Sequence, residues 1–368
     1  MPVHDVLQRA AVAAAIAVVS AVAPAVAQSA AAITAEKVMH FEVLAKPGRN
    51  AMGSYGQYDR AGNTRNWKWK TPDGSEVSFV ADHPTSTTLV LKSRQFDYPL
   101  SIDLVALTVA KLTDAGKPID VSRVPITNVS FDGCDLRLLR PLQGEAGLGE
   151  VMKKKKDIDD DLSGETTALK KDPIKVVQGL GGQLFVLDHH HGALAWIKAE
   201  HPVATCQIIN PDDPLPTANP AAFWSQLQAR NWVRLADKDG NPIAPEALPQ
   251  KLTDLPNDPY RTLAWMIRSQ HRDGFCRSLM LPSPPPFAEF KWADWMRKRA
   301  DLPGAKVAAA TDPSLWKPNN KKNREAAQAE VLAAALQAAK SPDAAGLPGY
   351  RGDKPADFHC PVAPGGED

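Results

Sequence analysis

The stretch Leu184–His201, LFVLDHHHGALAWIKAEH, constrains the fold more than any other part of the chain. Its first four residues form a continuous apolar run with the length of a buried strand, and the turn Gly179–Gly182 precedes them. A helix is expected to follow, with Asp188 as its N-cap and with Lys198 and His201 in its last turn. The stretch therefore predicts a strand, a tight turn and a helix.

The start of this helix is a candidate anion site. The first amides of a helix have no acceptor within it, and the helix dipole adds partial positive charge there. His189, His190 and His191 occupy the turn, and an imidazole can hydrogen-bond a phosphoryl oxygen, transfer a proton or ligate a metal. Because consecutive helical residues point about 100° apart, at most two of the three share a site. The alternative is a polar helix start whose histidines are solvated or cap backbone groups.

Further sequence blocks accompany this stretch in a fixed order. LLRPLQ and GLGEVMKKK precede it, and NDPYRTLAWMIR, PFAEFKWADWMRKR and LPGYRG follow it, so that together they span about 136–352. The set resembles the ParB-like nuclease family with a DHHH motif, a branch of the ParB/sulfiredoxin superfamily. The resemblance implies an α+β fold with a mixed ParB/sulfiredoxin-like core and a helical C-terminal part. It also implies a ligand that contains phosphate, such as nucleic acid.

The histidine turn departs from the wider superfamily. Many relatives carry Gly-x-x-Arg there, whereas this chain has His189 and Gly192 at those two positions. The guanidinium that would clamp a phosphate must therefore be replaced by a histidine, a metal ion or an arginine from elsewhere. Arg261 and Arg268 lie on one face of a helix predicted to begin at Pro259, and either could supply it. The alternative is a core face with snorkelling arginines.

Glu289, in the FAEF part of the penultimate block, is the candidate carboxylate acid or base, although most glutamates lie at the surface. Sulfiredoxin chemistry is set aside because the turn carries no cysteine. A divalent ion such as Mg²⁺, Mn²⁺ or Zn²⁺ could bind at His190 and His191. The predicted catalytic residues are thus His189, His190, His191 and Glu289, and the predicted phosphate-binding residues are Asp188, Gly192, Arg261 and Arg268.

The net charge of the 368 residues is +1, which does not indicate a strongly basic nucleic-acid binder. Any polyanion contact would need a local patch, and Lys291–Arg324 carries a local charge of +6. Residues 1–27 have the pattern of a secretory signal, with Arg9, an apolar run and the cleavage site Ala25-Val26-Ala27. They predict a periplasmic or secreted protein without a transmembrane segment after cleavage. The alternative is an uncleaved anchor.

Residues 28–120 are expected to form a small, mainly-β domain. Trp67–Thr71 and Ser75–Val80 flank Pro72-Asp73-Gly74, a hairpin signal, and Thr87–Lys92 is a further β-branched run. The apolar residues of Leu100–Leu112 fit both strand and helix periods. We assign 121–300 to a ParB/sulfiredoxin-like domain and 301–368 to a basic linker, a helix and a tail.

The four cysteines, Cys134, Cys206, Cys276 and Cys360, form no CxxC pair, which argues against a zinc ribbon. In an oxidising compartment they allow up to two disulfides with three connectivities. Cys206, in an apolar run, could equally be a buried free thiol.

Three functions fit these observations. The first is a secreted enzyme that cleaves phosphate esters, in particular a metal-dependent nuclease. The second is a non-catalytic module that binds phosphate or a nucleotide, and the third is a phosphotransferase of the same superfamily. The sequence leaves the choice of substrate, the oligomeric state and any protein partner open.

Overall fold

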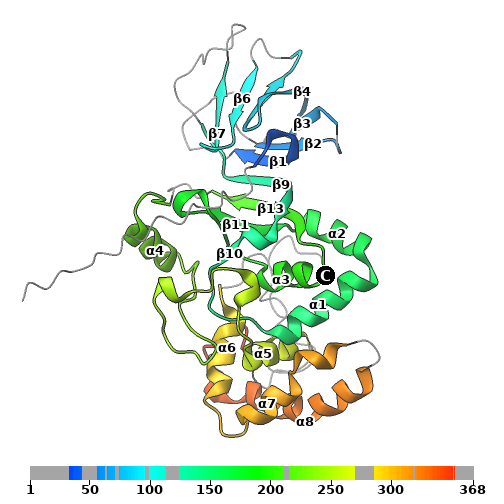
Figure 1. The fold of residues 1–368 in the computed structure, drawn as a ribbon, viewed down its shortest axis with the longest axis vertical. Helices are drawn as coiled ribbons and strands as arrows, with labels where there is room; N and C mark the ends of the chain where they lie inside the picture. Colours follow the sequence, from blue (N-terminus) through cyan, green and yellow to red (C-terminus); the bar gives the residue numbers. More distant parts are fainter. Residues whose placement is uncertain are drawn as a thin grey trace, which may run out of the picture.

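The computed structural model describes a set of ranges within the chain. These are residues 33–43, 56–62, 64–70, 74–95, 99–112, 124–210, 215–269, 286–317, 320–350 and 352. The predicted signal at 1–27 lies outside them. The described residues form a mixed α/β structure with eight α-helices and one thirteen-stranded sheet. Figure 1 shows the sheet running from the N-terminal strands into a core that carries helices at its far end.

The N-terminal part of the sheet is an antiparallel meander. The predicted hairpin is confirmed, because Trp69 pairs with Val77 across it. The ambiguous segment at 100–112 is a second hairpin, which turns where Leu107 takes a positive φ of 49°. The strands are β1 (Val38–Val43), β2 (Gly56–Arg60), β3 (Asn66–Lys70), β4 (Glu76–Thr85), β5 (Thr88–Lys92), β6 (Leu100–Asp103), β7 (Thr108–Lys111) and β8 (Val124–Pro125).

Alternation of side chains gives this meander its core. In β3 the buried residues Trp67 and Trp69 alternate with exposed residues, as expected of a strand with one face turned to a core. The ring of Tyr58 stacks on both Phe41 and Trp69, with centroids 4.4 and 5.8 Å away. These tryptophans are therefore packing residues.

β9 (Asn128–Asp135) joins the two parts of the sheet. It pairs antiparallel with β1 on one side and with β13 (Val203–Ile209) on the other, so the ladder continues across the region where we divided the domains. β11 (Ile174–Gln178) runs parallel to β13 and antiparallel to β12 (Leu184–Val186). β12 in turn runs parallel to the short edge strand β10 (Arg140–Pro141).

The helices cover the core and form its C-terminal part (Figure 1). α1 packs against α3 and α5 packs against α6, and the last four helices share one apolar cluster. The α-helices are α1 (Leu148–Asp160), α2 (Leu162–Lys171), α3 (His190–Lys198), α4 (Pro220–Ala229), α5 (Pro259–Ser269), α6 (Ala288–Arg297), α7 (Gly304–Ala310) and α8 (Lys321–Lys340). Short 3-10 helices occur at Ala35–Lys37, Leu136–Leu138, Leu180–Gly182, Pro245–Ala247, Leu252–Asp254, Pro313–Trp316 and Pro342–Ala344.

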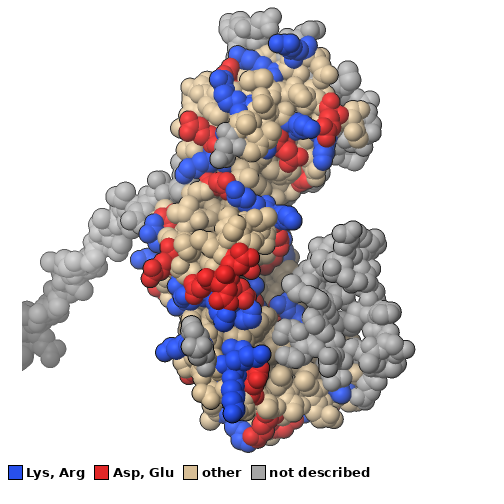
Figure 2. Space-filling model, turned by 90° about the vertical axis from the view of Figure 1, so that its right-hand side faces the viewer, with Lys and Arg blue, Asp and Glu red and all other residues tan. Residues whose placement is uncertain are grey.

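Charged side chains lie mainly in local pairs. Along α1, lysines pair with aspartates four residues later, as in Lys153–Asp157 and Lys155–Asp159. Figure 2 shows the face that carries α1 and α2, where acidic side chains gather beside basic ones. Part of the predicted basic stretch is neutralised in the same way, since Arg299 pairs with Asp301. These exposed pairs contribute little to stability.

Cys134 and Cys206 form a disulfide between β9 and β13, so the expectation of a free thiol at Cys206 is wrong. Cys276 and Cys360 lie outside the described residues. Within the described ranges, no helix combines the length and the apolar character that a membrane span requires.

Candidate functional site

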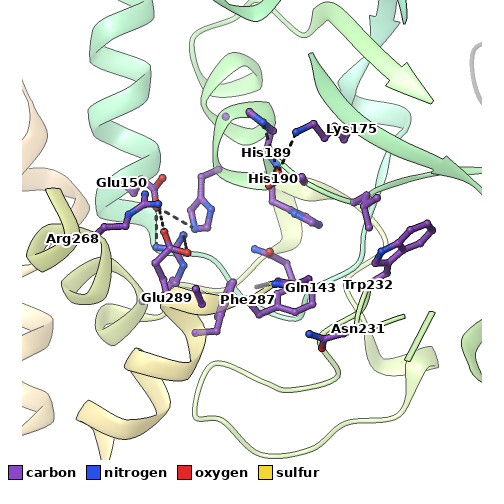
Figure 3. Close-up of a pocket in the computed structure, with 18 of the residues that line it drawn as sticks. Gln143, Glu150, Lys175, His189, His190, Asn231, Trp232, Arg268, Phe287 and Glu289 are labelled. Carbon is purple, nitrogen blue, oxygen red and sulfur yellow. Dashed lines mark hydrogen bonds and ion pairs between the residues drawn. The ribbon is translucent and has the colours of Figure 1, made fainter. Parts of the chain in front are cut away.

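The histidine turn opens onto a cleft of about 560 Å³. The cleft lies between the start of α3, the segment before α1, and the facing ends of α5 and α6, as Figure 3 shows. Its lining brings together all eight predicted site residues. The lining residues are Gln143, Glu150, Lys154, Asp172, Lys175, Leu187, Asp188, His189, His190, His191, Gly192, Asn231, Trp232, Arg261, Arg268, Pro286, Phe287, Ala288, Glu289 and Phe290.

The helix begins one residue later than the sequence predicted. Its N-cap is His189, which takes a left-handed conformation at φ 70° and makes no side-chain cap. The prediction of Asp188 as the N-cap is therefore wrong, because its Oδ1 instead accepts the N–H of His189 at 2.7 Å. A left-handed backbone favours glycine, so His189 takes a conformation that is uncommon for a histidine.

The side chains of His190 and His191 point into the protein and form hydrogen bonds with backbone groups. Their side chains are buried, and each Nε2 accepts a backbone N–H, that of Leu142 at 3.1 Å and that of Gly147 at 3.0 Å. His190 also hydrogen-bonds the carbonyl of Val186. Both ring nitrogens of His190 are thus engaged, which matches the alternative of histidines that cap backbone groups.

Burial keeps both of these rings uncharged. Desolvation lowers the pKa of His190 far below its ordinary value, and it lowers the pKa of His191 to about 4. Among the residues that the structure describes, no three His, Cys, Asp or Glu side chains converge as metal ligands. The predicted pair of metal ligands, His190 and His191, therefore has no third protein ligand there.

His189 is the least buried of the three histidines that line the cleft. Its Nε2 lies 3.3 Å from Asp172 Oδ2 and 3.9 Å from Asp188 Oδ2. The hydrogen bond from His189 is the main reason that the pKa of Asp172 falls to about 2. Lys175 Nζ lies 3.6 Å from Asp172 Oδ1, so it belongs to the same cluster. Nδ1 of His189 has no hydrogen-bond partner within the described ranges.

Sequence reasoning missed Asp172 because it precedes the turn by seventeen residues. The signal that could have found it is the pairing of β11 with β12. These strands are antiparallel with Val176 opposite Val186, so each step back along β11 is a step forward along β12. Extending that register places Asp172 beside the first residues of α3.

The arginines meet two glutamates on the opposite side of the cleft. Arg261 Nη1 lies 3.0 Å from Glu150 Oε2, and Arg268 Nη1 lies 2.7 Å from Glu289 Oε1. Arg261 also approaches Glu289, at 3.7 Å. The prediction that these arginines snorkel from a core face does not fit Arg261, which is buried among carboxylates.

These opposite charges decide which groups are ionised. Burial alone would raise the pKa of Glu289, but Arg261 and Arg268 lower it below its ordinary value. Burial would likewise raise the pKa of Glu150, yet the positive charge around it brings that pKa to about 2. Glu289 is therefore a carboxylate that orients two guanidinium groups.

The first amides of α3 remain available. The N–H groups of His190, His191 and Gly192 find no acceptor among the described residues, and all three residues line the cleft. Such amides and the helix dipole favour an anion at this position.

A comparison with known protein families finds a match over the part of the chain that forms the cleft. Residues 133–298 match the family model described as "Putative ParB-like nuclease". This segment is a ParB-like domain. It runs from β9 to the end of α6 and includes every residue that lines the cleft.

The chain is also similar to a solved structure, the "Crystal structure of protein Atu1540 from Agrobacterium tumefaciens". The sequence identity is 27%, the match covers 62% of this chain and 98% of that chain, and the TM-score is 0.45. None of the curated proteins compared with the chain matches it.

Proposed function

We propose that the ParB-like domain hydrolyses phosphodiester bonds of nucleic acid in this cleft. The observation that carries the proposal is the arrangement of His189. One ring nitrogen meets the carboxylate of Asp172, the other is free, and unpaired helix amides lie beside it. A carboxylate that orients one nitrogen of an imidazole leaves the second nitrogen ready to act as a base.

The roles follow from the contacts. The amides of α3 hold a non-bridging phosphate oxygen, and Lys175 and Arg268 neutralise its charge. His189 takes a proton from the attacking water as the new oxygen–phosphorus bond forms. The bond to the leaving oxygen then breaks, and that oxygen takes up a proton from His189 or from solvent to leave as an alcohol. Asp172 orients the ring. His190 and His191 are positioning residues, because they fix the backbone against which the turn rests.

The described residues do not by themselves form a set of metal ligands, so we derive no step through a metal ion. Secretion is the second part of the proposal. The predicted signal at 1–27 supports it, and so does the Cys134–Cys206 disulfide, since such bonds persist in oxidising compartments.

The test is cleavage of a single-stranded oligonucleotide and of plasmid DNA by the protein that begins at Gln28. Each reaction is run with EDTA and with Mg²⁺, Mn²⁺ or Zn²⁺, which also tests the predicted dependence on a divalent ion. We expect cleavage by the unmodified protein and at least a hundredfold loss in His189→Ala. His201→Ala, which changes an exposed histidine after the same helix, is the matched control and should retain activity.

Three outcomes would overturn the proposal. Equal cleavage by the His189→Ala variant would remove the cleft from the reaction. Binding without cleavage under every condition would favour the non-catalytic phosphate or nucleotide module. A product that appears only with ATP or ADP would favour a phosphotransferase instead.

A further inference from the structure

The cleft has a second wall, whose residues have no role in the proposed hydrolysis. Trp232 and Asn231 lie just after α4, and Phe287 lies just before α6. Figure 3 shows Trp232, Asn231 and Phe287 along the right-hand and lower sides of the cleft, with Gln143 between Phe287 and Trp232. Trp232 and Phe287 are only half-buried, so part of each ring is accessible.

Local backbone geometry fixes this wall. Asn231 takes φ 55° because it ends α4, where the next N–H, that of Trp232, returns to the carbonyl of Leu227. Phe287 takes φ 60°, a conformation that a phenylalanine rarely adopts. With His189, three of the five described non-glycine residues with positive φ line one cleft.

The rings are backed by packed neighbours. Phe287 meets Phe290 edge-on, with centroids 5.9 Å apart. The ring of Phe290 is buried and lies 5.1 Å from the Arg261 guanidinium, which connects this wall to the ionic one. The guanidinium of Arg230 lies 5.2 Å from the Trp232 ring.

Gln143 adds an oriented amide. It is 2% exposed, and its Nε2 donates to the carbonyl of Glu145 at 2.7 Å. That bond fixes the orientation of the amide, while Oε1 accepts no hydrogen bond from the residues described. An amide oxygen that lines a cleft can accept a hydrogen bond from a donor on a ligand.

We propose that the cleft takes one unstacked nucleobase of a single-stranded nucleic acid. The base stacks on Trp232 and Phe287, the amides of Gln143 and Asn231 meet its edge, and the adjoining phosphate lies at His189. A base within a duplex has both faces covered by its neighbours, whereas a single strand can present a face to an aromatic ring. This inference rests on the proposed function and names its substrate class.

The experiment measures binding of fluorescein-labelled oligothymidine by anisotropy, with His189→Gly present throughout to prevent cleavage. Adding Trp232→Ala should weaken the affinity about tenfold or more, which is the effect of losing one base–aromatic stack. Trp232→Phe should restore most of it. An abasic oligonucleotide of the same length should bind weakly to all three proteins, and so should a duplex.

Equal affinity for the abasic, single-stranded and duplex probes, with no effect of Trp232→Ala, would overturn the inference. The two proposals fail separately. Cleavage of abasic and base-containing strands at one rate leaves the hydrolase standing and removes the base site. Base-dependent binding to a protein that cleaves no nucleic acid supports the base site and removes the hydrolase.

Discussion

At the scale of single residues, three adjacent histidines have two kinds of environment. His190 and His191 are buried and accept backbone N–H groups, whereas His189 is partly exposed and lies 3.3 Å from the carboxylate of Asp172. The sequence predicts that at most two of them share a site, because helical geometry separates their directions. It could not tell which of them would be buried, since that depends on the left-handed turn at His189.

The left-handed backbone gives a sharp test of His189. His189→Gly should leave the unfolding midpoint unchanged or raise it, since relief of the positive φ contributes up to about 1 kcal/mol. Cleavage should nevertheless be lost. Thermal unfolding and activity are measured on the same preparation, with His189→Ala as the control that keeps the backbone strain. A stable His189→Gly that still cleaves would contradict the role of the imidazole.

His191 gives a prediction about pH. Its folded pKa, about 4, lies below the ordinary 6.5, so the unfolded chain binds the proton more strongly in that window. Folding stability from this residue is therefore present above 6.5 and lost as pH falls towards 4, by about 1.4 kcal/mol per pH unit. His191→Asn, which keeps an acceptor, should remove that slope. Urea unfolding between pH 4 and pH 7 measures the free energy of unfolding of both proteins. If the two plots of this free energy against pH run parallel, His191 is not a buried ring that folding keeps neutral.

At the scale of elements, the segment between β10 and α1 holds the site together. The two inward histidines bind its backbone, and it forms isolated β-bridges with loop residues far along the chain, at Gln143–Arg234 and Ala146–Asn257. Gly144 permits the close approach, since a Cβ there would lie 2.0 Å from the carbonyl oxygen of Ala236. Most strands and helices were predictable from periodicity and caps, but these tertiary pairings were not.

Glu145, in the same segment, gives a dependence of folding stability on pH whose sign is opposite to that of His191. Burial raises its pKa to about 7 despite the contact of 2.6 Å with Arg234, so the folded state holds the proton more strongly than the unfolded state. Its contribution is full below 4.5 and is lost as pH rises towards 7. In Glu145→Gln, stability relative to the unmodified protein should rise across that window. A constant difference at every pH would contradict a raised pKa.

These two slopes have opposite signs, so each masks part of the other in the unmodified protein. A flat pH profile there would not mean that buried groups keep ordinary pKa values. Only the difference between each variant and the parent isolates one group, which is why both variants are needed.

At the scale of the whole molecule, one sheet carries both the N-terminal meander and the ParB-like domain. The sequence predicted a mainly-β N-terminal part and a mixed core with a C-terminal helical part, and each pattern is recognisable in the strands and helices described. The continuous ladder through β9 was not predictable. A single strand that pairs on both edges looks in sequence like any other apolar run.

The disulfide lies at this junction and should stabilise the whole fold. It closes a span of 72 residues, for which loop closure in the unfolded chain gives an upper value of about 4 kcal/mol. Cys134→Ala combined with Cys206→Ala should lower the denaturation midpoint, and a reducing agent should lower that of the unmodified protein but not of the variant. Equal midpoints with and without reductant would show that the bond is absent.

The cleft draws its walls from segments between 143 and 290, and this affects the order in which the protein becomes competent. A growing chain acquires its histidine turn long before α5 and α6 supply their arginines and Glu289. Until residue 290 has left the ribosome, the nascent protein carries half a site. Fragments that end within α4 would leave His189 facing open water. Activity in this cleft therefore requires the chain through residue 290, and it appears late in synthesis.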